Sequence, residues 1–110
     1  MATFLCSCTY TSESMRSMVQ QPQDREVAVR KVLHACQMTL QSIYFELPSR
    51  VHLIIEGSNA SKNAFAMAIA SSGALVPETW QVTEVVSSQE FTETMKRAHE
   101  VTGSYKSPVH

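Results

Sequence analysis

The stretch 40–57 consists of two runs in which hydrophobic and polar residues alternate, separated by a turn. In the first run every second residue from Ile43 to Leu47 is apolar, and successive side chains of a strand point to opposite faces. The second run begins after the Pro48–Arg50 break. A loop of odd length keeps the apolar residues of both runs on one face, whereas a two-residue loop would mix the faces. We therefore predict a β-hairpin in which Glu46 lies directly opposite His52.

The remaining chain changes between the period of a strand and that of a helix. Ser87 and Glu90 form a potential capping box, with Val86 and Phe91 as its hydrophobic staple. Gly73 suits the left-handed position that follows a helix. The predicted elements are a strand over 2–10, a helical turn over 13–19, a helix from Asp24 toward Leu40, the hairpin, a helix over 60–72, a strand over 79–86 and a helix from Ser87 to about Thr102.

This order of elements predicts an α+β fold, a ferredoxin-like βαββαβ domain with an extra C-terminal helix. Right-handed crossovers place both connecting helices on one face of a four-stranded antiparallel sheet. We expect the domain to span 1–103, followed by a tail over 104–110. The face under the helices should hold Phe4, Cys6, Cys8, Ile43, Phe45, Leu47, Val51, Leu53, Ile55, Trp80 and Val82.

The other face of the predicted sheet mixes polar and apolar residues. It is too apolar to be left in water and too polar for an ordinary core, so either a second subunit or the last helix should cover it. Simple alternation puts Glu84 on the core face, which predicts a bulge or a strand end nearby. The members of the mixed face are Leu5, Ser7, Tyr44, Glu46, His52, Ile54, Gln81, Thr83 and Val85.

Composition narrows the classes of partner. The 110 residues make one domain with a net charge of −1, which lacks the clustered Lys and Arg of a nucleic-acid binder. No apolar run approaches the ~20 residues that span a bilayer, and the N-terminus has no signal-peptide pattern. Three cysteines form no disulfide framework, so we expect a cytoplasmic protein. From the charge and the lack of a spanning run, we expect neither nucleic acid nor membrane as a partner.

Three features resemble the GYD-domain family: the run MATFLCSCTYT, the Gln-Pro that precedes a long helix, and the strand SIYFEL. The resemblance covers Met1 to about Val86, although Pro48–Arg50 stands where the family has its Gly-Tyr-Asp tripeptide. It implies membership of the dimeric α/β-barrel group of ferredoxin-like proteins, and hence a homodimer or higher homo-oligomer. Other members of that group are cofactor-independent monooxygenases, isomerases and polyketide cyclases. This likeness of fold is weak support for function.

Candidate chemistry concentrates on the mixed face. A carboxylate beside an imidazole orients the ring and supports acid or base chemistry near neutral pH, so His52 is a candidate base and Glu46 its orienting partner. Tyr44 would donate a hydrogen bond to a substrate. The alternative is an ordinary polar cross-strand pair that contributes a few tenths of a kcal/mol to ~1 kcal/mol. The further residues expected to contact a ligand are Ser7, Leu5, Ile54 and Thr83.

The sequence predicts neither a metal nor an organic cofactor. Cys6 and Cys8 lack further ligands at metal-binding spacing and fit a buried apolar role. The three glycines form no phosphate-binding loop. Three functions therefore remain open: a homodimer that binds a small organic molecule at the polar sheet face, a cofactor-independent isomerase, cyclase or monooxygenase, and a non-catalytic assembly module.

Overall fold

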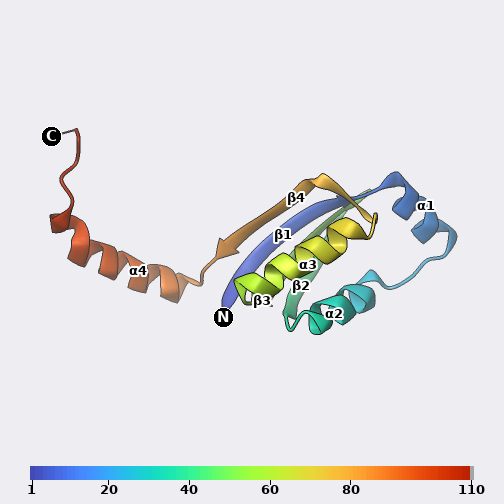
Figure 1. Cartoon of the computed structure of the whole chain (residues 1–110), viewed down its shortest axis with the longest axis horizontal. Coiled ribbons are helices and arrows are strands. Elements are labelled where there is room, and N and C mark those ends of the chain that lie inside the picture. Colours follow the sequence, from blue (N-terminus) through green and yellow to red (C-terminus); the bar gives the residue numbers. More distant parts are fainter. Residues whose placement is uncertain (110) are drawn as a thin grey trace.

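The computed structural model of the protein describes residues 1–109 and contains a four-stranded antiparallel sheet in the order β2-β3-β1-β4 (Figure 1). Helices α2 and α3 lie on one side of this sheet, and α4 projects from its end, so the molecule measures 61 × 30 × 23 Å. The elements are β1 (Ala2–Tyr10), α1 (Ser12–Gln20), α2 (Arg25–Ala35), β2 (Thr39–Glu46), β3 (Arg50–Gly57), α3 (Asn59–Ser71), β4 (Leu75–Val85), α4 (Ser88–Val101) and the 3-10 turn η1 (Thr102–Ser104).

This architecture confirms the predicted ferredoxin-like α+β fold with a C-terminal helix. Thr11, Asp24 and Ser58 cap the first three helices, each accepting a hydrogen bond from a backbone N–H of the first turn. The core lies between the sheet and the helical layer, where Leu33 of α2 and Phe65 of α3 are 1% exposed. The sheet contributes to this core mainly through residues that are at most 4% exposed: Phe4, Cys6, Cys8, Val51, Leu53 and Ile55.

A bulge in β2 allows Leu40 and Ile43, which are three positions apart, to face the core together. Leu40 pairs with Ile55 and Ile43 pairs with Leu53, with a register shift between Leu40 and Ser42. Without that extra residue, Leu40 would face away from the helices, since side chains alternate strictly along a regular strand. The prediction that Leu40 belongs to the preceding helix is therefore wrong, because the residue is buried as part of the strand.

Strand β4 contains a larger irregularity and begins earlier than predicted. The register shifts between Ser7 and Thr9 of β1, so that Thr9 pairs with Val76 across a bulge that includes Thr79. The Thr79 hydroxyl accepts a hydrogen bond from the Thr9 backbone N–H at 2.9 Å and donates one to the Val76 carbonyl at 2.6 Å. The Thr79 side chain thus replaces part of the backbone hydrogen bonding between β1 and β4 that the bulge interrupts. The expected bulge or strand end near Glu84 is a strand end, one residue further on at Val85.

Helix α2 ends at Ala35, five residues before the predicted point. The backbone N–H of Met38 donates to the Leu33 carbonyl, and that of Gln37 donates to the His34 carbonyl. These two bonds form a Schellman motif, with Gln37 in the left-handed conformation at φ 61°. The chain therefore leaves the helix in time to begin β2 at Thr39.

The hairpin has an odd loop, as predicted, but its register differs by one residue on each side. Phe45 pairs with Val51, and Leu47 leaves the strand. Leu47 is consequently 88% exposed and Phe45 is 47% exposed, so the prediction that both belong to the core is wrong. The alternation of hydrophobic residues predicts which face of the sheet each residue occupies, but it does not predict the residue at which the pairing of β2 and β3 ends.

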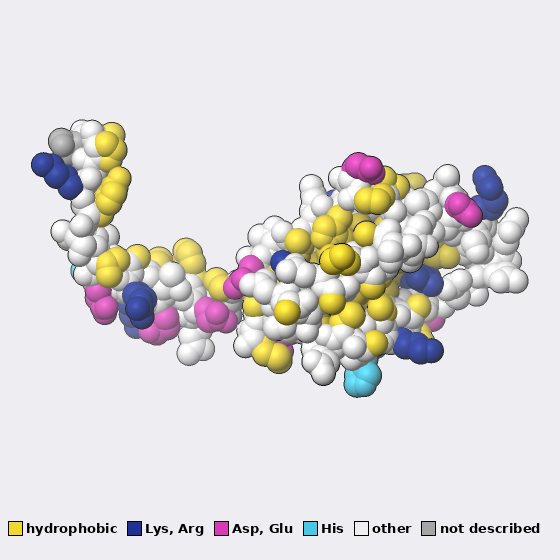
Figure 2. All heavy atoms as spheres, in the orientation of Figure 1, with side chains coloured by type: hydrophobic (Ala, Val, Ile, Leu, Met, Phe, Trp, Pro, Cys, Tyr) yellow, Lys and Arg dark blue, Asp and Glu magenta, His cyan; other side chains and the backbone are white. Residues whose placement is uncertain are grey.

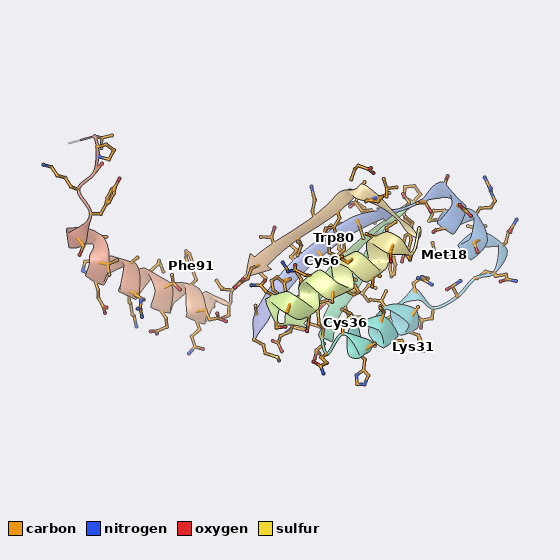
Figure 3. The ribbon with its side chains drawn as sticks, viewed as in Figure 1. Cys6, Met18, Lys31, Cys36, Trp80 and Phe91 are labelled. Carbon is orange, nitrogen blue, oxygen red and sulfur yellow. The ribbon has the colours of Figure 1, made fainter. Side chains whose placement is uncertain are left out.

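Helix α4 makes no buried contact, even though its start was predicted correctly. The Ser87 hydroxyl accepts a hydrogen bond from the Glu90 backbone N–H at 3.1 Å. No residue of α4 is buried (described residues 88–101), and Phe91 is 57% exposed, far from Trp80 in the core (Figure 3). Figure 2 shows hydrophobic atoms along one side of this helix and charged groups along the other. The last helix therefore does not cover the mixed face of the sheet. Of the predicted tail, His110 lies outside the described residues.

Candidate site on the open face of the sheet

The candidate site lies on the open face, which we define as the face of the sheet opposite α2 and α3. Four side chains form a row across it, one from each strand. Tyr44 of β2 pairs with His52 of β3, His52 pairs with Ser7 of β1, and Ser7 pairs with Gln81 of β4. Antiparallel pairing places such partners about 4.5–5.5 Å apart. The sheet order therefore assembles polar residues that lie far apart in the sequence.

A chain of two hydrogen bonds runs through His52. Its Nδ1 lies 2.7 Å from the Ser7 hydroxyl oxygen, and its Nε2 lies 2.8 Å from Glu46 Oε1. A carboxylate can only accept, so Nε2 carries the proton in the neutral ring and Nδ1 accepts from the Ser7 hydroxyl. The His52 side chain is 32% exposed and that of Glu46 is 62% exposed. The relay can therefore hold a proton and is open to solvent.

The structure brings His52 and Glu46 together, as predicted, but not by direct cross-strand pairing. Tyr44 is the residue opposite His52, and Glu46 pairs with Arg50. Glu46 reaches His52 along the diagonal of the face, which an extended carboxylate side chain can span. The prediction that Glu46 lies directly opposite His52 is wrong for the same reason that Leu47 leaves the strand. Tyr44 is 68% exposed beside the ring.

The remaining ligand-contact candidates form a second row next to the polar one. Leu5 of β1 pairs with Ile54 on one side and with Thr83 on the other. Leu5 is 42% exposed, so an apolar strip borders the Ser7–His52–Glu46 relay. The open face thus offers an apolar surface and polar groups two residues apart along the same strands.

Arg50 belongs to this face and was missed by the sequence prediction, which placed it in the hairpin turn. Its Nη1 donates to the Thr9 hydroxyl at 3.3 Å, and its Nη2 donates to Gln81 Oε1 at 2.9 Å. Both acceptors are neutral, so they hold the guanidinium without cancelling its charge. The signal that could have found it is parity, because Arg50 precedes His52 by two residues and a strand repeats its faces at that spacing.

The cysteines lie behind the open face, in the core. Burial raises the pKa of the Cys6 thiol to about 12, and the nearby Cys8 adds to that rise. Burial also raises the pKa of Cys8 to about 11, against a smaller lowering by the positive charge of Arg50. A thiol with so high a pKa is a poor nucleophile, because the thiolate is the reactive form. Both residues therefore act in packing.

Residues 1–109 contain no group of three or more His, Cys, Asp or Glu side chains that could hold a metal ion. Within the same residues no helix has the length and apolar character needed to cross a membrane. The open face itself supplies an imidazole, a carboxylate, hydroxyls and a guanidinium, from the residues described above.

A family model described as the GYD domain matches residues 4–95, and the chain belongs to this family. The match confirms the resemblance drawn from the sequence and extends it into α4. No curated protein matches the chain.

Two solved structures show a distant similarity to the chain. One is described as a transposase candidate from Deinococcus radiodurans R1, with 15% identity, a TM-score of 0.46 and coverage of 91% of each chain. The other is a REP-associated tyrosine transposase bound to a REP hairpin, with 16% identity and a TM-score of 0.48. That match covers 84% of this chain and 61% of the other. We draw no argument from likeness at this level.

Proposed function

We propose that the protein is a homodimer that binds a small organic molecule between the open faces of two sheets. The observation that carries this proposal is the Ser7–His52–Glu46 relay, which lies on a sheet face left uncovered by residues 1–109. Leu5 and Tyr44 are 42% and 68% exposed beside it. An apolar strip next to convergent polar groups is the usual composition of a small-molecule site.

A second copy of the chain is the partner proposed to enclose this site. Face-to-face packing of two sheets would bury Leu5 and Ile54 and would turn an open face into a cavity. Helix α4 does not serve as the cover, since it projects away from the sheet. The free Cys6, Cys8 and Cys36 fit a reducing, cytoplasmic setting for this dimer.

The dimer is tested by substituting Leu5→Glu and measuring the solution mass by light scattering over a range of concentrations. The new carboxylate would be buried without a partner in a face-to-face dimer, so we expect a monomer. Val27→Glu is the matched control, because Val27 is 63% exposed on α2 and lies on the helical side. A dimer that survives Leu5→Glu, or one lost equally in both variants, would contradict the proposed interface.

The ligand site is tested by an NMR fragment screen on the dimer, recorded through backbone amide shifts. The expected result is a set of compounds that shift Leu5, Ser7, His52 and Thr83 together. Hits that map only to the helical layer would contradict a site on the open face.

An acid–base enzyme that needs no cofactor is a second candidate, and the hydrogen-bond relay specifically favours it. The Ser7 hydroxyl would accept a proton from the substrate while passing its own proton to His52 Nδ1. Glu46 would stabilise the imidazolium through Nε2, and Tyr44 would donate a hydrogen bond to the developing oxyanion. Return of the proton to another substrate atom completes an isomerisation with no net change in the protein.

This candidate is tested by deuterium exchange at the acidic C–H of 1,3-diketones and α-keto acids in D2O. His52→Ala should lower exchange by roughly 10²- to 10⁴-fold, the usual contribution of a positioned base. Glu46→Gln, which keeps the shape but removes the charge, should cause a smaller loss. Exchange that is unchanged in both variants would leave the relay with a binding role only.

A non-catalytic assembly module is a third candidate, favoured by the exposed apolar side of α4. Phe91 and Met95 are 57% and 49% exposed, four residues apart on one side of the helix. Phe91→Glu therefore complements Leu5→Glu in the mass measurement. Loss of the oligomer in Phe91→Glu alone would favour assembly through α4 over pairing of the sheets.

A further inference from the structure

A separate pocket of about 220 Å³ lies at the hairpin end of the sheet, beside α1 and the start of α2. Its apolar lining comes from three different parts of the chain, and two arginines, Arg25 and Arg50, also line it. The Arg50 guanidinium donates to Thr9 and Gln81, as described above. The lining residues that matter are Tyr10, Met15, Met18, Arg25, Phe45 and Leu47.

The Arg25 guanidinium contacts Tyr10 and Gln23. It lies over the Tyr10 ring at 5.9 Å, and its Nη1 donates to the side-chain oxygen of Gln23. Its Nε–H is buried and has no hydrogen-bond partner. The ion pairs among residues 1–109 are Glu26–Arg30, Glu46–His52 and Glu93–Lys96, so no carboxylate of this part of the chain neutralises Arg25.

A buried N–H donor without an acceptor is unfavourable, and more so when the group is charged. Bound water does not explain how this N–H is tolerated. The adjoining cavity, which shares Tyr10 and Arg25 with the pocket, measures about 40 Å³ and is otherwise lined by apolar side chains such as Val29 and Leu53. A water molecule there would lack the two to four polar partners that hold buried water in place.

We propose that this pocket binds a small organic anion with an apolar body, whose carboxylate group pairs with Arg25. Since Nη1 is engaged by Gln23 and Nε is shielded from solvent, Nη2 is the nitrogen of the guanidinium left for a ligand. A charge-assisted hydrogen bond from an arginine to a carboxylate is short and strong. The Tyr10 ring lies against the guanidinium, with 5.9 Å between Cζ and the ring centroid.

The apolar body of the ligand lies along the methionines and the hairpin. Phe45 and Leu47 are 47% and 88% exposed, and a ligand in the pocket would cover part of that surface. Met15 and Met18 are flexible side chains that adapt to ligands of different shape. The pocket therefore selects for a negative group and a hydrophobic chain or ring, with little discrimination in the shape of the latter.

This site is distinct from the one on the open face, although Glu46 and Arg50 belong to both. Glu46 lines the pocket while its Oε1 contacts Nε2 of His52. Its negative charge opposes that of an incoming anion at the rim.

The experiment uses two matched pairs of probes, hexanoate with hexanamide and benzoate with benzamide, titrated into the full chain. The readouts are the Arg25 Nε–Hε resonance and the methyl resonances of Met15 and Met18. We expect the anions to shift all three, with an affinity at least tenfold higher than that of the amides. Arg25→Gln should remove this advantage, and Arg25→Lys should restore only part of it, because a lysine keeps the charge but not the planar guanidinium that lies against Tyr10.

Lys31→Gln is the control variant, since it removes one positive charge from the exposed side of the same helix (Figure 3). Its anion affinity should equal that of the unmodified chain. Dispersed amide spectra of each variant show that the fold is kept. Equal binding of anions and amides, anion binding that survives Arg25→Gln, or no shift at Arg25 with either anion would overturn the proposal. Shifts on the open face report separately on the site proposed above.

Discussion

The two faces of the sheet carry the same backbone ladder but opposite kinds of side chain, and strand β1 shows the contrast within nine residues. Phe4, Cys6 and Cys8 point toward the helices and are at most 2% exposed, whereas Leu5 on the other side is 42% exposed. One face therefore contributes stability through burial, and the other leaves its side chains exposed. Alternate residues of the same strand thus differ in their contribution to stability, and the open face can carry the proposed site at little cost to the core.

The largest expected effect comes from truncation on the covered face. Phe65→Ala should lower the free energy of unfolding by about 3–5 kcal/mol, since it empties a core site and removes the contact with Trp80. Tyr44→Ala on the open face should cost under about 1 kcal/mol in the monomer, because the side chain is mostly exposed. Urea denaturation of both variants measures the difference. Equal losses would show that the open face is already packed in solution.

Alkaline pH should weaken the covered face specifically. Burial raises the pKa of Cys6 to about 12 and of Cys8 to about 11 from an ordinary 9.0, so the folded state holds protons that the unfolded state releases. This contribution is complete below pH 9.0 and is lost as pH rises from there through the raised values.

The urea midpoint of the unmodified chain should therefore fall more steeply than that of a Cys6→Ala/Cys8→Ala variant between about pH 8 and pH 10.5. All other groups are common to both proteins and cancel in the comparison. Parallel curves would show that the thiols are not buried in solution.

On the open face the Ser7–His52 hydrogen bond should contribute only about 0.5–1.5 kcal/mol, the usual net value for such a bond. A double-mutant cycle of Ser7→Ala and His52→Ala measures it as the difference between the double variant and the sum of the single ones. A cycle of Ser42→Ala and His52→Ala is the control, as Ser42 lies on the same face one register pair away. Coupling in both cycles would mean that His52 acts through general packing and not through Ser7.

The smallest effect is expected where the helical layer joins the sheet. Gln37 occupies the left-handed region at φ 61°, which glycine adopts without a steric penalty. Gln37→Gly should raise the free energy of unfolding by a few tenths of a kcal/mol to about 1 kcal/mol, reduced by the added freedom of the unfolded chain. Thr39→Gly, within the strand, should have the opposite sign. Destabilisation by both would indicate that the Gln37 side chain makes a contact that matters.

The faces of the sheet could be predicted because alternation is a local property of each strand. Cys6, Val51 and Leu53 were assigned correctly from parity alone. The ends of the elements could not be predicted, because they depend on bonds between distant residues. The Thr9–Thr79 bond that bridges the bulge joins residues seventy positions apart, and no local pattern indicates it.

The candidate site was predictable in part for the same reason. Parity placed His52, Glu46 and Ser7 on one face, and the sheet order brought them within hydrogen-bond distance. Arg50 was missed because the strand begins one residue earlier than its hydrophobic pattern. Arg25 was missed because a basic residue at the start of a helix usually faces solvent, and only the packed structure shows its Nε–H buried.

The interruption of β4 has a consequence for the outer edge of the sheet. β4 is an edge strand, and the unpaired backbone groups of such a strand can recruit the strands of neighbouring chains into open-ended aggregates. The irregular segment that ends at Thr79 includes Pro77, which has no N–H to offer an incoming strand. The bulge that places Leu75 and Trp80 against the helices therefore also hinders the pairing of β4 with strands of other newly made chains.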